Sequence, residues 1–454
     1  MEDNKKDYYA NLTAKELEVL AEQGDPKAQF RLGYRYKTGK GIKQNYKKAI
    51  EWLTKAAMQG NSNAQYSLGT CYNRGKGVKK DYSKAVVWYS KSAEQGNMPA
   101  QFDLGACYYM GHGVKQDYKK ALEWYFKAAE QGDSWSQNDI GICYLNGYGV
   151  EKDLQKAVEW LTKSAKQGYA TAQYNLARCY MDGEGVAQDM KKAVELYKKA
   201  ATQGHAWSQN NLGLCYEYGD GVKKNYKKAF EWFTKAAEQD VDTSICHLGI
   251  CYEFGRGVVK NIGTAVDLYT KAAERGNIGG QYHLAKCYRN GKGVLQNHTK
   301  AFELFIKGAK KGDALSQFYV GICYECGEGV EQDFAKAAKW YTKAANQDIE
   351  EAQFNLCTFY KFGIGVKQNN FKAIEWCSKS ADLGSEKAQF IMGECYENGD
   401  GVERNLKKAK EWYAKAAKLG YKEAMQRLIE LELKENDFID LPRFESDIYP
   451  DCPF

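Results

Sequence analysis

The 454-residue chain has few histidines, few prolines and no long apolar segment, and these shortages narrow what it can do. Its five histidines leave few general bases for an enzyme, and no HExxH, GxSxG or protein-kinase pattern occurs. No apolar run is long enough to span a bilayer. The polar start, with acidic and basic residues mixed, is not typical of a signal peptide. The sequence therefore predicts a cytoplasmic protein, or one exported as an effector without a cleaved signal.

What the chain has in quantity is one 36-residue unit, copied eleven times from Asp25 to Gly420 without insertion or deletion. Counted from Asp25 as position 1, position 12 is always Tyr, positions 15 and 17 are always Gly, and positions 25 and 33 are always Ala. A fixed period of this length indicates a solenoid, in which each unit is stable only when stacked on its neighbours. Because no strand pattern occurs, we expect an all-α array of helix-turn-helix repeats.

Each unit predicts two helices. Asp or Asn near position 1 suits the N-cap of the first helix, and Gly at position 15 suits its left-handed end. Asn or Asp at position 21 caps the second helix, and Gly at position 36 turns the chain into the next copy. Asp240 and Asp348 are the two exceptions at position 36. We therefore expect backbone strain or a bend at Asp240, the junction of copies six and seven.

The two ends differ from the repeats. Thr13–Gln23 carries a capping box of Thr13 and Glu16, and 421–434 resembles a first helix without its terminal Gly. The expected organisation is an N-terminal capping helix in 1–24, eleven repeats in 25–420 and a C-terminal capping helix in 421–435. An extended or disordered acidic tail over 436–454, which holds three of the five prolines, completes the chain.

The repeat resembles the Sel-one-like repeat, a relative of the tetratricopeptide repeat, over residues 25–420. In the second copy the matching residues are Ala64, Gln65, Leu68, Gly69, Tyr72, Gly75, Gly77, Ala85, Trp88 and Ala93. The resemblance implies a right-handed α–α superhelix and a scaffold or adaptor role in protein complexes. One branch of the family has been linked to β-lactam binding and has two cysteines at each repeat junction. This chain usually has one cysteine per repeat, at a different place.

Fourteen cysteines are present, and nine of them occupy position 11 of a repeat. Equivalent positions in successive copies are separated by two helix widths of roughly 8–10 Å each, too far for a disulfide. We therefore expect reduced, buried thiols. Cys323 and Cys326 form a CxxC pair without a second pair, and His247 and His283 share position 7 of adjacent copies, so we expect no metal site. The Gly-x-Gly loops follow helices rather than strands, which argues against phosphate-binding loops of the nucleotide-binding kind.

Positions 3, 6, 10, 13 and 14 of the first helix vary between copies, and aromatic residues are frequent among them. By alignment with the tetratricopeptide fold they line a concave groove. In copies four and six, Trp replaces the usual residue at position 3 and Asn replaces the usual ring at position 6. The residues predicted to bind a partner are Trp135, Asn138, Tyr174, Arg178, Trp207, Asn210, Phe102 and Tyr66. Two interpretations are open. In the first, Trp anchors a peptide and Asn binds the peptide backbone. In the second, Trp only fills the volume of the ring that is missing at position 6.

The function predicted from the sequence is a non-catalytic scaffold or adaptor that binds a protein or peptide along this groove, with no catalytic residue and no cofactor. A first alternative is an enzyme of the β-lactam-binding type. A second is nucleic-acid binding along an aromatic groove, which requires a positive surface. The groove positions instead mix Arg74 and Arg178 with Glu217, Glu253 and Glu325, so we expect neither nucleic-acid binding nor membrane insertion.

Overall fold

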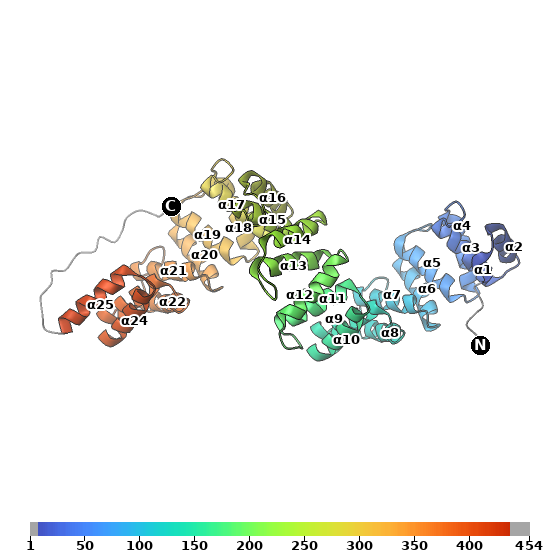
Figure 1. Ribbon diagram of the computed structural model, residues 1–454, viewed down its shortest axis with the longest axis horizontal. Coiled ribbons are helices and arrows are strands. Elements are labelled where there is room, and N and C mark those ends of the chain that lie inside the picture. The colour runs from blue at the N-terminus through green and yellow to red at the C-terminus, as the bar shows by residue number, and fades with distance from the viewer. Residues whose placement is uncertain (1–7, 436–454) are drawn as a thin grey trace. The chain divides into compact units, whose positions relative to one another are not determined.

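The structure, a computed structural model, describes residues 8–435. The predicted tail, 436–454, lies outside these residues. The described part of the chain forms 25 helices and no strand (Figure 1). It divides into two compact units, with the division between Trp232 and Phe233 inside α14. The predicted all-α fold is confirmed.

Two helices belong to each repeat, and consecutive helices pack against each other along each unit. The first helices are α3 (Pro26–Thr38), α5 (Ser62–Arg74), α7 (Met98–Met110), α9 (Ser134–Asn146), α11 (Ala170–Asp182), α13 (Ala206–Tyr218), α15 (Asp242–Phe254), α17 (Ile278–Asn290), α19 (Ala314–Cys326), α21 (Glu350–Phe362) and α23 (Glu386–Asn398). The second helices are α4 (Tyr46–Met58), α6 (Tyr82–Glu94), α8 (Tyr118–Glu130), α10 (Leu154–Lys166), α12 (Met190–Thr202), α14 (Tyr226–Glu238), α16 (Ile262–Glu274), α18 (His298–Lys310), α20 (Phe334–Ala345), α22 (Asn370–Asp382) and α24 (Leu406–Lys418). Three further helices stand at the ends: α1 (Tyr8–Asn11), α2 (Ala14–Glu22) and α25 (Lys422–Glu435).

The helix ends follow the predicted caps. Asn45 accepts a hydrogen bond from the backbone N–H of Lys48, and an Asp or Asn does the same in every described second helix whose cap is defined. Gly39 ends α3 in the left-handed conformation, with φ 76°, which glycine adopts without steric cost. The capping box of Thr13 and Glu16 is present in α2.

Asp240 and Asp348 adopt φ of 62° and 59°, the left-handed conformation that Gly has at position 36 of other copies. They are the non-glycine residues with positive φ in the described range. Helix α15 starts two residues after Asp240, as α13 starts two residues after Gly204. The expected backbone strain is therefore present at Asp240, at a cost of roughly 1–2 kcal/mol. The bend at this junction stays a prediction.

Within a repeat, position 9 of the first helix touches position 29 of the second. At Gly69 an added Cβ would lie 2.6 Å from the ring of Tyr89, so a larger residue there requires the ring to shift. Copy five has Ala177 and Tyr197 at these two positions. In copy ten this Gly–Tyr pair is replaced by Cys357 and Cys377, both buried. A larger residue at one position thus accompanies a smaller one at the other, which keeps the volume between the two helices nearly constant.

Between repeats, the invariant Gly at position 17 lies against the start of the preceding second helix. An added Cβ at Gly113 would come within 2.4 Å of the backbone of Tyr82, and Gly149 meets Tyr118 in the same way. Position 17 therefore needs glycine for close approach as well as for its positive φ.

A buried glutamine at position 5 joins three helices. Gln65 donates from Nε2 to the carbonyl of Ala57 on the preceding second helix, 3.1 Å away, and its Oε1 accepts from Gln95 at 2.7 Å. The bond to the preceding carbonyl occurs in all ten copies with Gln at position 5, at 3.0–3.4 Å. The second bond requires Gln at position 35 of the same copy.

Where position 35 is not Gln, the position-5 amide oxygen has no partner. Copies eight, ten and eleven have Lys311, Leu383 and Leu419 at position 35. In those copies Oε1 of Gln281, Gln353 and Gln389 is buried without a hydrogen bond. A buried acceptor without a partner destabilises the folded state, because the hydrogen bonds that it makes to water in the unfolded chain are not replaced.

The thiols at position 11 are buried, and no disulfide joins the cysteines of the described residues. Burial raises the pKa of Cys107, Cys143 and Cys215 to about 12, so these thiols stay protonated. They fill space between the helices, as expected for small apolar side chains.

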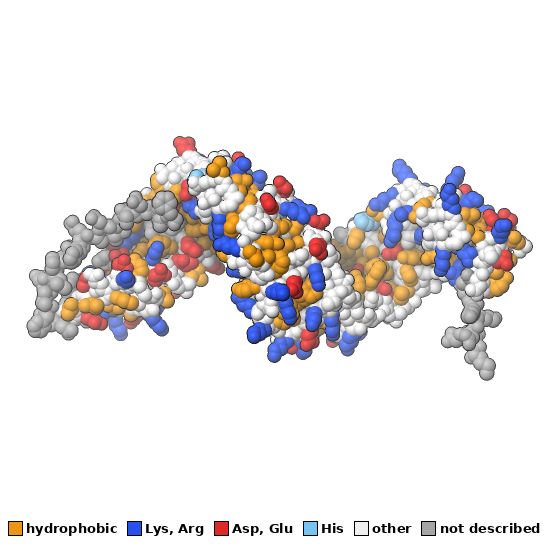
Figure 2. Space-filling model, turned by 45° about the horizontal axis from the view of Figure 1, so that its top comes forward, with side chains coloured by type: hydrophobic (Ala, Val, Ile, Leu, Met, Phe, Trp, Pro, Cys, Tyr) orange, Lys and Arg blue, Asp and Glu red, His pale blue; other side chains and the backbone are white. Residues whose placement is uncertain are grey.

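The outer surface of the second helices carries lysine over tryptophan. Lys55 Nζ lies 4.3 Å from the ring centroid of Trp52, and the same pair occurs in six more copies at 3.7–4.7 Å. Figure 2 shows Lys and Arg side chains spread among hydrophobic and acidic ones on the face turned to the viewer. Each exposed cation–π pair stabilises its helix by about 0.5–1 kcal/mol.

We predict that Leu383→Gln stabilises the second unit by about 1 kcal/mol, because it supplies a donor for the buried Oε1 of Gln353. Leu383 is 51% exposed, so the substitution removes little apolar burial. Urea unfolding of the full chain, followed by circular dichroism, measures the change.

The matched control makes the same substitution together with Gln353→Ile, which copies the Ile245 of copy seven. The gain should disappear in that background. An equal gain with and without Gln353 would show that the missing hydrogen bond is not its source.

Candidate functional site

The candidate binding surface comprises positions 3, 6, 10, 13 and 14 of the first helices, and is called the first-helix face below. The rings at position 6 are partly buried on this face. Tyr66 and Phe102 each lie 5.9 Å, centroid to centroid, from the fully buried tyrosine at position 29 of their copy. Tyr174 lies 6.0 Å from Tyr197 in the same way. Each ring therefore contacts the core on one side and leaves part of its surface accessible to solvent.

Trp135 and Trp207 are 52% and 50% exposed. The indole of Trp135 packs edge-on against Phe102 of the preceding copy, at 5.4 Å, and lies 6.2 Å from Tyr169 of the following copy. The ring therefore contacts neighbours in both directions and still presents half of its surface. Both interpretations of the Trp substitutions agree with this geometry, since the indole covers part of the core and also offers a contact area.

Asn138 and Asn210 are buried, at 2% and 4% exposure. The Asn138 amide donates to Asp139 at 2.9 Å and accepts from Asn175 of the next copy, also at 2.9 Å. Asn210 donates to Asn211 at 3.1 Å. The structure thus places these amides beneath the surface with partners inside the chain. What copies four and six offer to a ligand is the indole above them.

Arg178 is exposed on the first-helix face, one turn beyond Tyr174 on the same helix, α11. Tyr174 lies 5.0 Å from His205, which caps α13 through its ring nitrogen. Of the eight predicted residues, three are exposed (Trp135, Trp207 and Arg178), three are partly buried rings, and two are buried amides.

A buried acid lies next to Asn138. Burial raises the pKa of Asp139 from 3.8 to about 6, although Asn138 and Tyr125 donate hydrogen bonds to its carboxyl group. Other copies have Asn at the same position 7, in Asn175, Asn211 and Asn355. At neutral pH copy four therefore holds a charged carboxylate where those copies hold a neutral amide.

The two histidines at position 7 lie in the second unit, each stacked on an aromatic residue at position 29. His247 is 4.8 Å from Phe233 and His283 is 4.9 Å from Tyr269, centroid to centroid. Burial lowers the pKa of His283 to about 4, so it is neutral at physiological pH. Residues 8–435 contain no group of three or more His, Cys, Asp or Glu placed to hold a metal ion.

A pocket of about 290 Å³ between copies one and two was not predicted from the sequence. Lys37, Thr38, Tyr46, Tyr66, Thr70, Cys71, Arg74 and Lys76 line it. Tyr66 alone belongs to the predicted set. Two basic residues indicate the pocket: Lys37 at position 13 of copy one and Lys76 at position 16 of copy two. Their proximity is evident only once the contacts between copies are known.

Among the described helices, none combines the length and the apolar character needed to cross a membrane.

We predict that Asp139→Asn stabilises the first unit by about 1–2 kcal/mol at pH 7.5 and leaves its stability unchanged near pH 3, below the pKa of this carboxyl in the unfolded chain. The folded-state pKa lies above that of the unfolded chain, so the stability that Asp139 contributes is lost as pH rises through about 6. Urea unfolding at the two pH values measures this difference.

The control is Asp182→Asn, which removes an exposed carboxylate from α11. It should show no gain that depends on pH. A gain for Asp139→Asn of equal size at both pH values would contradict the explanation.

The comparisons with known proteins agree on the family. The model of the Sel1 repeat matches residues 26–61, 62–97, 99–133, 136–169, 170–205, 208–241, 243–277, 279–313, 314–349, 350–385 and 386–421. No curated protein gave a significant match to the chain.

Two solved structures are similar in sequence and fold. One is c5321, a protective antigen of uropathogenic Escherichia coli with an SLR fold. It is 37% identical, with a TM-score of 0.76, and the alignment covers 93% of this chain and 91% of that one. The other is a Sel1 repeat protein from Oxalobacter formigenes, 32% identical with a TM-score of 0.52, covering 67% of this chain and 88% of that one. Eleven successive matches and this likeness over most of the chain show that the protein belongs to the Sel1 repeat family.

Proposed function

We propose that the protein is a non-catalytic scaffold or adaptor that binds a protein segment along the first-helix face of copies three to six, with Trp135 and Trp207 as anchors. The observation that carries the proposal is the half exposure of these two tryptophans on helices α9 and α13. Sel1 repeats form a solenoid of the kind that commonly serves protein interaction, which agrees with this role.

Large apolar side chains are exposed repeatedly on this face. Besides the two tryptophans, the exposed residues at its positions are Tyr34, Met110, Tyr218, Phe254, Leu315 and Phe362. They come from different copies of the repeat: four are at position 14, Tyr34 is at position 10 and Leu315 is at position 3. Exposed aromatic and Met side chains on a soluble surface are typical of protein-binding sites.

The anchors are held in place before any partner arrives. The indole of Trp135 packs on Phe102, and the buried bond between Asn138 and Asn175 ties its helix to the next copy. A side chain that is already ordered loses little conformational entropy on binding, and Trp, Tyr and Arg are the residues most often responsible for binding energy. Arg178, exposed between the two tryptophan-bearing helices, supplies a charge to the same surface.

Charge on the first-helix face favours a protein over a nucleic acid. Acidic groups stand among its basic ones, including Glu253 and Glu325, whose carboxylates accept hydrogen bonds from Tyr269 and Tyr341. A surface that follows a phosphate backbone needs a continuous positive track.

We predict that Trp135→Ala with Trp207→Ala weakens peptide binding by roughly 30-fold or more, since a hot-spot truncation costs at least about 2 kcal/mol. Peptides selected from a displayed library against the wild-type protein serve as ligands, and fluorescence anisotropy measures their affinity for both proteins. The double variant should remain folded, because each indole is half exposed.

The matched control is Trp124→Leu with Trp160→Leu on the second helices. Leu already occupies the equivalent position 28 in copies five, seven and eight. This variant should bind the selected peptides as the wild type does. Equal affinity of the wild type and the first-helix variant, at unchanged thermal stability, would refute the proposal.

A further inference from the structure

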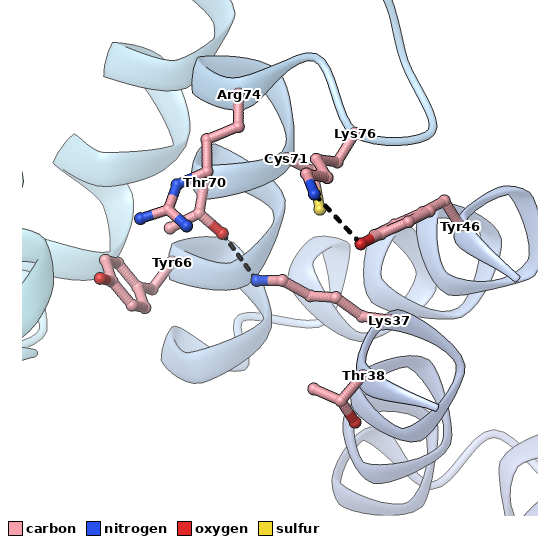
Figure 3. Close-up of a pocket in the computed structure, with 8 residues that line it drawn as sticks. All are labelled: Lys37, Thr38, Tyr46, Tyr66, Thr70, Cys71, Arg74 and Lys76. Atoms are coloured by element: carbon pink, nitrogen blue, oxygen red, sulfur yellow. Dashed lines mark hydrogen bonds between the residues drawn. The ribbon is translucent and has the colours of Figure 1, made fainter. Parts of the chain in front are cut away.

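The pocket between copies one and two is lined by three basic side chains and by no acidic one. Lys37 comes from α3, Arg74 from the end of α5 and Lys76 from the loop that follows it. Figure 3 shows Lys37 reaching from α3 toward Thr70 on α5. Its Nζ donates to Thr70 Oγ1 at 2.7 Å, and Lys76 Nζ lies 3.4 Å from the hydroxyl of Tyr46. The pocket thus gathers three positive charges around neutral partners.

The same site recurs between copies ten and eleven with different charges. A pocket of about 190 Å³ there is lined by Lys361, Cys395 and Asp400, among others. These residues occupy the repeat positions of Lys37, Cys71 and Lys76. Lys361 Nζ lies 3.3 Å from the carboxylate of Glu394, which takes the position of Thr70. In the second pocket one lysine faces two acidic residues. In the first pocket, Thr70 and Lys76 stand at the positions of these two acidic residues.

Elsewhere in the second unit, position 13 of one copy pairs with an opposite charge at position 16 of the next. Glu253 lies 2.7 Å from Lys292, and Arg289 lies 2.6 Å from Glu328. Lys37 and Lys76 occupy these two positions and carry the same charge. The geometry that produces an ion pair at these two junctions therefore places two cations on one pocket here.

Nothing within the pocket balances this charge. Burial lowers the pKa of Lys37, and the charge of Arg74 lowers it further. Burial raises the pKa of the Cys71 thiol, which is therefore not an anion at neutral pH. The carboxyl of Asp103 attracts Arg74, but it faces Tyr66 and does not line the pocket.

We propose that this pocket binds a phosphate group, held by Lys37, Arg74 and Lys76 with Tyr46 and Tyr66 at its edges. A guanidinium and two ammonium groups offer charge-assisted donors to phosphate oxygens. A bound dianion would take the place that Glu394 and Asp400 fill in the equivalent pocket of copies ten and eleven. The proposal does not rest on the proposed function, since it concerns other copies and a different ligand.

The test measures binding of inorganic phosphate to the full chain by equilibrium dialysis with radiolabelled phosphate at low ionic strength. The wild type should bind one phosphate per chain. Thr70→Glu with Lys76→Asp, which copies the residues of copy eleven, should weaken binding by at least roughly tenfold, the effect of losing one charge-assisted contact. The variant is expected to fold, because copies ten and eleven contain the same residues at the same positions.

The reverse exchange gives an independent test. Glu394→Thr, Asn398→Arg and Asp400→Lys transfer the basic set to the pocket of Lys361, and the stoichiometry should rise from one to two. Tighter binding of phosphoserine than of inorganic phosphate would show that the pocket takes phosphate esters, and the opposite order that it takes the free ion. Absence of binding at millimolar phosphate, equal binding by the first variant, or equal competition by acetate would overturn the proposal.

Discussion

The array depends on one polar contact that is repeated inside an otherwise apolar interface. The glutamine at position 5 bonds a carbonyl of the preceding copy with one end of its amide and the second helix of its own copy with the other. Small residues such as alanine and glycine let the helices approach closely, but they do not fix the register of one helix against the next. Where position 35 is Gln, as in copy two, the amide is bonded at both ends and fixes the register of three helices at once. Neighbouring first helices consequently present their variable positions at regular intervals.

Much of the fold could be predicted because the same physical demands recur eleven times. Tyr at position 12, Gly at positions 15 and 17 and Asn or Asp at position 21 recur in every copy, and each marks a helix end or a close approach. Asp240 and Asp348 were recognisable as exceptions because Gly stands elsewhere at that position, and both adopt the left-handed conformation. The volume exchange between Cys357 and Cys377 could not be anticipated, since position 29 was known only as part of a buried stripe.

The candidate site was predicted less fully. Alignment with the tetratricopeptide fold predicted that Trp135 and Trp207 lie on an accessible face, and they are half exposed. Spacing alone could not show that Asn138 turns inward to meet Asn175, because that contact joins two copies. The basic pocket was not predicted either, because it too is formed by residues of two copies. Lys37 and Lys76 are 39 residues apart, and their proximity follows only from how copy one stacks on copy two. Contacts within one copy of the repeat can be predicted from the sequence period. Contacts between copies can be identified only when the packing of the copies is known.

The hydrogen bonds of Gln65 and Gln101 stay within the glutamine's own copy and the one before it. Removing one whole unit would give the next glutamine an equivalent carbonyl and leave no gap between layers. Gene duplication and loss can thus lengthen or shorten such a protein in steps of 36 residues, at a cost set by the surface lost rather than by damage to the interior. The reach of the molecule can change while its cross-section stays constant.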